Sequence, residues 1–183
     1  MKILFLEWKS YCVPDMIEAL ETAGHYVTLI TCKEMTDRYN TEFEKIFNSY
    51  IEQVSYDAVF TFNYFPIVSK MCNKLNLLYI SWVYDNPLVT LFSCTVINKC
   101  NRIFLFDRNS YEYFHNAGIE TVFYLPLCAN PQRLCSYTTD PSPINDISFV
   151  GSLYTEPKQR LYDRIDGIDE YSKGYLDAMV NAQ

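Results

Sequence analysis

Short apolar runs alternate along the chain with stretches in which apolar residues recur at helical spacing. Apolar runs predict six strands, at residues 2–6, 26–31, 58–62, 77–83, 102–106 and 121–125. Apolar residues three or four positions apart predict helices at residues 14–23, 43–54, 64–75 and 111–117, and more weakly at 88–98. Strands joined by helices are typical of parallel sheets, so we predict an α/β fold: a Rossmann-like, doubly wound, mainly parallel sheet with helices on both faces.

Turn and capping residues indicate where these helices begin and end. Pro14 and Pro66 suit first turns, because proline lacks an N–H group that is unpaired there in any case. Gly118 suits the end of the helix before it. Either Asn109 or Ser110 is predicted to cap the start of that same helix.

The pattern changes after residue 125. Prolines interrupt a region without clear periodicity, which we interpret as a linker, at positions 126, 131, 141 and 143. A strand is predicted at 146–150 and a helix at about 157–165. We therefore predict a first domain at 1–138, and at 139–183 a linker with the start of a second α/β domain or a C-terminal helical extension. A complete second domain needs more residues, so we interpret the chain as truncated or as part of a split protein.

The stretch 77–87 joins an apolar strand to a polar corner. It reads Leu-Leu-Tyr-Ile-Ser-Trp-Val and then breaks into Tyr-Asp-Asn-Pro, which a central strand could not continue. Ligands of open α/β sheets bind beyond the carboxyl ends of the strands. Four residues here are placed at such an end: Trp82, Tyr84, Asp85 and Asn86. The alternative is that Asp85 belongs to an ordinary Asn-Pro turn.

Four loop residues that follow other predicted strands are expected to line the same crevice. They are Trp8, Lys9, Asn63 and Asp107. The chain contains 16 tyrosines and 12 phenylalanines, and a tyrosine offers both an apolar face and a hydroxyl group. That combination suits sugar binding, and it equally suits a tyrosine-rich core.

Composition narrows the possible partners and compartment. The 183 residues, 49% of them hydrophobic, suffice for a folded core. A net charge of −7 without a basic block argues against nucleic acid as a partner. The seven cysteines form no C-x-x-C pair, no stretch has the length of a transmembrane helix, and Glu7 interrupts the N-terminal apolar run. We therefore expect a cytoplasmic protein with reduced thiols.

Several functional classes lack their motifs. The five glycines have neither the dinucleotide-binding nor the P-loop spacing, and there is no G-x-S-x-G motif. A flavodoxin would need a glycine-containing phosphate loop after the first strand, and a receiver domain an aspartate where Phe62-Asn63 stands. His25 and His115 are too few for a metal site and are interpreted as structural. We predict no metal and no resident cofactor.

Ordered segments resemble a known enzyme family. Residues 19–30 resemble the "AL…GH.V" segment near the start of many GT-B glycosyltransferases, and residues 102–107 and 116–131 are similar to the end of their N-terminal domain. With 82–87 between them and 147–152 after, the nearest match is the spore-maturation CgeB-like group with its DUF3880-type N-terminal half. The order and spacing of these segments carry the resemblance.

The resemblance implies the N-terminal half of a GT-B architecture. GT-B enzymes have two Rossmann-like domains, the first mainly for the acceptor and the second for the nucleotide sugar, usually without a catalytic metal. Asp85 would be the base or the ligand of the acceptor hydroxyl. Gly151 and Ser152 would lie near the donor diphosphate, or would simply form a tight turn. The partners would be a carbohydrate or glycosylated acceptor and a donor-binding domain, and the first domain alone should be inactive.

The other crevice residues take supporting roles in this hypothesis. Trp8, Trp82 and Tyr84 would stack on an acceptor ring or pack in the core, while Lys9 and Asn63 would bind polar groups. The chain departs from many GT-B enzymes in lacking a glycine-rich loop after its first strand. A second hypothesis is a non-catalytic Rossmann-like module that binds a sugar, a metabolite or a partner protein.

Overall fold

The computed structural model describes residues 1–138, together with 147, 149, 151, 169–172 and 174. The chain divides into two compact units, Met1–Tyr137 and Thr138–Gln183. The strand predicted at 146–150 lies outside the described residues apart from Ile147 and Phe149, and the helix predicted at 157–165 lies outside them altogether. The fold below is that of the first unit.

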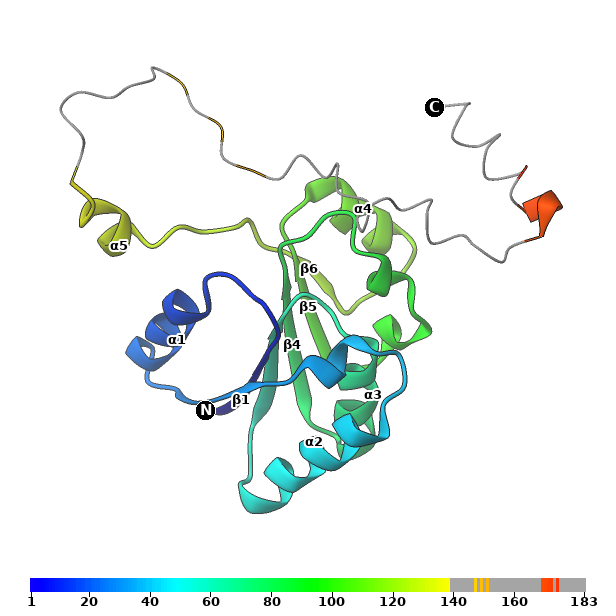
Figure 1. The fold of residues 1–183 in the computed structure, drawn as a ribbon, viewed down its shortest axis with the longest axis horizontal. Coiled ribbons are helices and arrows are strands. Elements are labelled where there is room, and N and C mark those ends of the chain that lie inside the picture. Colours follow the sequence, from blue (N-terminus) through cyan, green and yellow to red (C-terminus); the bar gives the residue numbers. More distant parts are fainter. Residues whose placement is uncertain (139–146, 148, 150, 152–168, 173, 175–183) are drawn as a thin grey trace. The chain divides into compact units, whose positions relative to one another are not determined.

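A six-stranded parallel sheet forms the centre of this unit, with the strand order β2-β1-β3-β4-β5-β6 (Figure 1). The strands are β1 (Lys2–Glu7), β2 (Tyr26–Thr31), β3 (Ala58–Phe62), β4 (Leu78–Val83), β5 (Asn101–Leu105) and β6 (Val122–Tyr124). All five strand pairs are parallel. The predicted α/β fold class and its six strands are confirmed.

The strand order reverses at β1. From β1 the chain crosses to β2 on one side, and it then returns to place β3 on the other side of β1. The loops after β1 and β3 therefore lead away from each other. Such a reversal creates a crevice at the carboxyl ends of the two strands, which is where doubly wound proteins bind ligands.

Five α-helices and three short 3-10 helices are present in the first unit. The α-helices are α1 (Val13–Thr22), α2 (Thr41–Gln53), α3 (Pro66–Leu75), α4 (Arg108–Asn116) and α5 (Pro131–Cys135). The 3-10 helices are η1 (Lys33–Thr36), η2 (Val89–Phe92) and η3 (Cys94–Ile97). Prolines lie in the first turns of α1 and α3, as predicted. Gly118 follows α4 with φ 83°, a conformation that glycine adopts without strain.

Three sequence predictions about helices need correction. The segment 88–98 forms η2 and η3 rather than one α-helix. Asp107, not Asn109 or Ser110, is the N-cap of α4, because its Oδ2 accepts a hydrogen bond from the backbone N–H of Ser110 at 2.7 Å. The region interpreted as a linker contains α5, whose N-cap Asn130 accepts from the N–H of Arg133.

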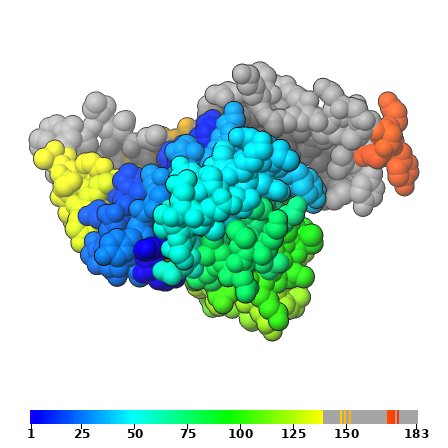
Figure 2. Space-filling model, turned by 90° about the horizontal axis from the view of Figure 1, so that it is seen from below, coloured from blue at the N-terminus to red at the C-terminus, as the bar shows by residue number. Residues whose placement is uncertain are grey.

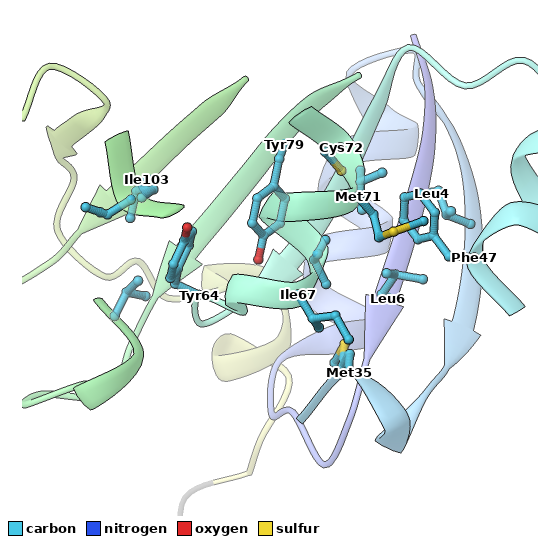
Figure 3. Packing of buried hydrophobic residues seen from close by; sticks show 14 of the residues in the cluster. Leu4, Leu6, Met35, Phe47, Tyr64, Ile67, Met71, Cys72, Tyr79 and Ile103 are labelled. Atoms are coloured by element: carbon cyan, nitrogen blue, oxygen red, sulfur yellow. The ribbon is translucent and has the colours of Figure 1, made fainter. Parts of the chain in front are cut away.

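Alternation along the strands directs side chains to two different cores. On one face, Leu4, Val59 and Tyr79 pack with residues of α2, α3 and α4 in the larger cluster. Figure 3 shows Tyr79 beside Tyr64, and the centroids of these two rings are 5.8 Å apart. Both rings are fully buried, so this face of the sheet carries the main hydrophobic core of the unit.

The other face carries the smaller core, which is strongly aromatic. Phe5, Phe60 and Phe62 are buried there against α1. Trp82 and Tyr84, on the same face at the end of β4, pack against this cluster without being fully buried. Because Phe62 is the register partner of Trp82, the aromatic surface runs continuously across the ends of β3 and β4.

The described helices are all short. None of those within the described residues is long and apolar enough to cross a membrane.

Candidate functional site

The carboxyl ends of β3 and β4 are joined through Asn63. Its Nδ2 donates to Asp85 Oδ2 at 2.7 Å, and its Oδ1 accepts from the backbone N–H groups of Tyr84 at 3.1 Å and Asp85 at 3.3 Å. Asp85 itself is exposed. This corner therefore presents one oriented carboxylate to solvent at the carboxyl ends of the strands.

A second chain of hydrogen bonds links this corner to α4. Ser110 Oγ donates to Asn86 Oδ1 at 2.9 Å, while the backbone N–H of Ser110 donates to Asp107. The hydrogen bond from the Ser110 backbone N–H is the main reason that the pKa of Asp107 lies below its usual value. Asp107 is therefore occupied as a helix cap, and Asn86 is held by a side chain of the same helix.

The loop after β1 contributes a separate pair of residues. Trp8 is half-buried and packs against the larger core, on the face opposite to Trp82. Lys9 has a left-handed backbone, with φ 50°, and its Nζ lies 5.1 Å from the centroid of the Trp8 ring. The two predicted tryptophans therefore do not form one stacking surface.

A pocket of about 820 Å³ opens between α1, the ends of β3 and β4, and the segment after β6. The aromatic residues of its lining are Tyr11, Phe62, Trp82 and Tyr84. The Phe62 ring centroid lies 5.4 Å from that of Tyr84 and 6.2 Å from that of Trp82. The size is that of a small-molecule site. The pocket lies at the carboxyl ends of the strands, where the fold favours ligand binding.

Residues Leu127–Arg133 form one side of this pocket. They belong to the segment Leu127–Tyr137, which we call the strap. Arg133 Nε lies 3.0 Å from Asp15 Oδ1, and Asn130 Nδ2 donates to Asp15 at 2.9 Å and to Glu18 at 3.4 Å. These partners lower the pKa of Asp15, the Arg133 hydrogen bond most of all. Figure 2 shows α5 in yellow against the blue of α1. The strap is thus attached to α1 through polar contacts.

No family model, no curated protein and no solved structure matches this chain. Its function must therefore be inferred from the geometry of the pocket and of the Asn63–Asp85 corner.

Two hydrogen-bond donors belong to the pocket wall. Burial raises the pKa of the Tyr84 phenol, so this hydroxyl stays protonated across the neutral range. Trp82 Nε1 is the one buried side-chain nitrogen or oxygen of the described residues that has no hydrogen-bond partner. An indole N–H can only donate, and a buried donor without a partner is costly. Both residues offer an aromatic face to a ligand ring, and the Tyr84 phenol can also donate to a hydroxyl, whereas Trp82 Nε1 is buried.

The structure brings some predicted site residues together and separates others. Trp82 and Tyr84 line the pocket, and Tyr84 also adjoins the Asn63–Asp85 corner through its backbone. Neither Asp85 nor Trp8 is among the pocket-lining residues. Gly151 is exposed in the second unit, and Ser152 lies outside the described residues. Asp15 and Glu18, two carboxylates of the pocket lining, were not predicted.

In the described part of the chain, no three His, Cys, Asp or Glu side chains lie close enough together to hold a metal ion. The site offers an exposed carboxylate at Asp85 and a phenol donor beside aromatic rings.

Proposed function

We propose that this chain carries the acceptor-side, carbohydrate-binding domain of a GT-B-type glycosyltransferase. The observation that supports this most is the aromatic pocket at the carboxyl ends of β3 and β4, lined by Phe62, Trp82 and Tyr84. Apolar C–H faces of a sugar ring pack on such aromatic faces, and a sugar hydroxyl would accept from the Tyr84 phenol. A nucleotide sugar bound by a second domain would be the donor.

Asp85 is the proposed catalytic group. Its carboxylate is exposed at the carboxyl end of β4 and is oriented by a hydrogen bond from Asn63 Nδ2, 2.7 Å away. The carboxylate would take the proton of the attacking acceptor hydroxyl while that oxygen bonds to the anomeric carbon and the nucleoside diphosphate leaves. The cytoplasm is the proposed compartment, where nucleotide sugars are made and where the seven free thiols stay reduced.

A second function, a non-catalytic sugar-binding module, is favoured by the position of Asp85. This carboxylate is not part of the pocket lining, and one of its oxygens already accepts from Asn63. A pocket can bind a sugar without any neighbouring base. Both functions therefore require a sugar to bind in the pocket, and only the first requires Asp85 to act as a base.

Two variants test the proposal, with sugar transfer assayed in a protein that includes the donor-binding domain. Glycan-array binding should detect a carbohydrate ligand, and Tyr84→Ala should weaken that binding about tenfold, because a stacking ring is lost. Asp85→Asn should leave binding within about twofold but lower sugar transfer from nucleotide sugars by about 10²–10⁴-fold. Tyr113→Ala is a matched control, since Tyr113 is exposed on α4 and outside the pocket.

Each outcome decides between the two functions. Sugar binding without transfer, unaffected by Asp85→Asn, would support the non-catalytic module. If no carbohydrate binds, or if Tyr84→Ala binds as well as the wild type, the pocket is not a sugar site and both functions are wrong.

A further inference from the structure

The charges on the wall of the pocket are mainly negative. Its charged lining residues are Asp15, Glu18 and Arg133. The Arg133 guanidinium is already paired with Asp15 at 3.0 Å. Within the described residues, the Glu18 carboxylate has a single and long hydrogen bond, 3.4 Å from Asn130 Nδ2, and its side chain is exposed. Glu18 is therefore the carboxylate that remains available to a bound molecule.

The N-terminus of α1, which adjoins the pocket, is a poor place for an anion. Helix N-termini attract phosphate through unpaired backbone N–H groups and the positive end of the helix dipole. Pro14 removes one of these N–H groups, and the Asp15 carboxylate already occupies the first turn. A phosphate bound here would lie against two carboxylates, while Arg133, the cation of the pocket lining, is paired with one of them.

The other polar groups of the pocket wall are neutral donors. The Tyr84 phenol stays protonated because burial raises its pKa. A neutral donor of this kind can bind a hydroxyl oxygen or an oxygen of an anion, so it does not distinguish neutral from charged ligands. Charge discrimination must therefore come from the α1 carboxylates.

We propose that the pocket takes neutral or amine-bearing sugars in preference to phosphorylated sugars, with Glu18 as the residue that determines this preference. The inference rests on the proposed function, because it names which carbohydrates the acceptor pocket admits. The ammonium group of an amino sugar is attracted to the Glu18 carboxylate, and a phosphate is repelled by it. Since Glu18 is exposed, the effect is modest, about two- to fivefold in affinity.

Calorimetric titration of the full chain tests this preference with matched sugars. The ligands are glucose, glucosamine and glucose 6-phosphate, with the corresponding galactose set, below neutral pH where the amine is protonated. We expect the amino sugar to bind about two- to fivefold more tightly than the neutral sugar, and the phosphate to bind most weakly. Glu18→Gln should abolish the preference for the amine, and Glu18→Lys should favour the phosphate.

Glu21→Gln is the matched control, because Glu21 is an exposed carboxylate of the same helix that does not line this pocket. It should leave the order of affinities unchanged. The inference is overturned if glucose 6-phosphate binds the wild type as tightly as glucose does, or if Glu18→Gln keeps the full preference for the amine. Failure of all six sugars to bind would instead contradict the proposed function, and the inference with it.

Discussion

Asn63 connects the geometry of two strand ends. Its backbone has φ 59°, in the left-handed region where asparagine is enriched among non-glycine residues. Its side chain bonds to Tyr84 and Asp85, and its carbonyl accepts from the hydroxyls of Thr61 at 2.6 Å and Ser81 at 3.0 Å. A single residue thus sets the direction of the chain after β3 and the orientation of the Asp85 carboxylate.

Replacing Asn63 separates its backbone role from its side-chain role. Asn63→Ala should lower the free energy of unfolding by about 2–3 kcal/mol, because it loses the hydrogen bonds and strains the left-handed backbone. Asn63→Gly relieves that strain and should cost about 1–2 kcal/mol. Urea denaturation measures both.

Asn76 provides the control. It has φ 58° but makes no side-chain hydrogen bond within the described residues, so Asn76→Gly should change the free energy of unfolding by less than about 0.5 kcal/mol. Equal losses for the two glycine variants would contradict the role given to the Asn63 side chain.

Residues that follow apolar strands could be predicted from the sequence, and residues on helix faces could not. Asn63 and Asp85 stand out because each ends an apolar run, and the structure joins them by a hydrogen bond. Asp15 and Glu18 look like the ordinary solvated face of α1. Asp15 belongs to the pocket lining beside Asn130, its partner 115 residues away in the sequence, and no local pattern reveals such a pair.

At the scale of elements, α5 shows why a proline-rich stretch can conceal structure. Five residues are too few for a periodic apolar pattern, and none of the described residues Pro131–Cys135 is buried. The detectable signal is the Asn130-Pro131 pair, an N-cap residue followed by a proline suited to the first turn. With little apolar burial, α5 depends on its polar contacts with α1 and should open more readily than the core helices.

Removing the ion pair of the strap tests that dependence. Arg133→Gln should increase amide hydrogen exchange severalfold in residues 132–137, because Asp15 loses its guanidinium partner. Exchange in β3 and β4 should not change, because those strands lie in the core. Arg108→Gln is the control, since it removes the exposed Arg108–Glu112 pair of α4 and leaves the strap intact. Unchanged exchange in α5 of Arg133→Gln would mean that the ion pair does not hold the strap.

At the scale of the whole unit, the sequence predicts where the strands lie along the chain but not which strands pair with one another in the sheet. All five residues of β3 are buried, whereas no residue of the edge strand β2 is. The apolar runs of the two strands look alike, because burial depends on which strands lie on either side and not on the run itself. The reversal at β1, and with it the position of the pocket, follows from pairing between distant segments that composition does not specify.

The unit also buries ionisable groups from several elements, in a way that links stability to alkaline pH. Burial raises the pKa of the Cys32 thiol to about 11 from 9.0, and it raises the pKa of Cys72 on α3 well above 9.0. Burial also raises the pKa of Tyr79 on β4. Unfolding exposes these groups, so above about pH 9 the unfolded chain binds fewer protons than the folded one. The folded state should therefore lose stability as the pH rises.

Cys32 provides the clearest measurement of this effect. Its stabilising contribution is complete below its unfolded pKa of 9.0 and declines as the pH rises from there through its folded value of about 11. This corresponds to a loss of about 1–3 kcal/mol in the free energy of unfolding from this residue. Urea denaturation across this range should show a shallower decline of the free energy of unfolding in Cys32→Ala than in the wild type. The variant is less stable than the wild type at neutral pH, because a buried side chain is truncated.

Cys135→Ala is the control for this pH dependence. It removes an exposed thiol of α5 and should retain the wild-type slope. Parallel pH profiles for the wild type and Cys32→Ala would mean that this thiol ionises in the folded protein as readily as in the unfolded chain.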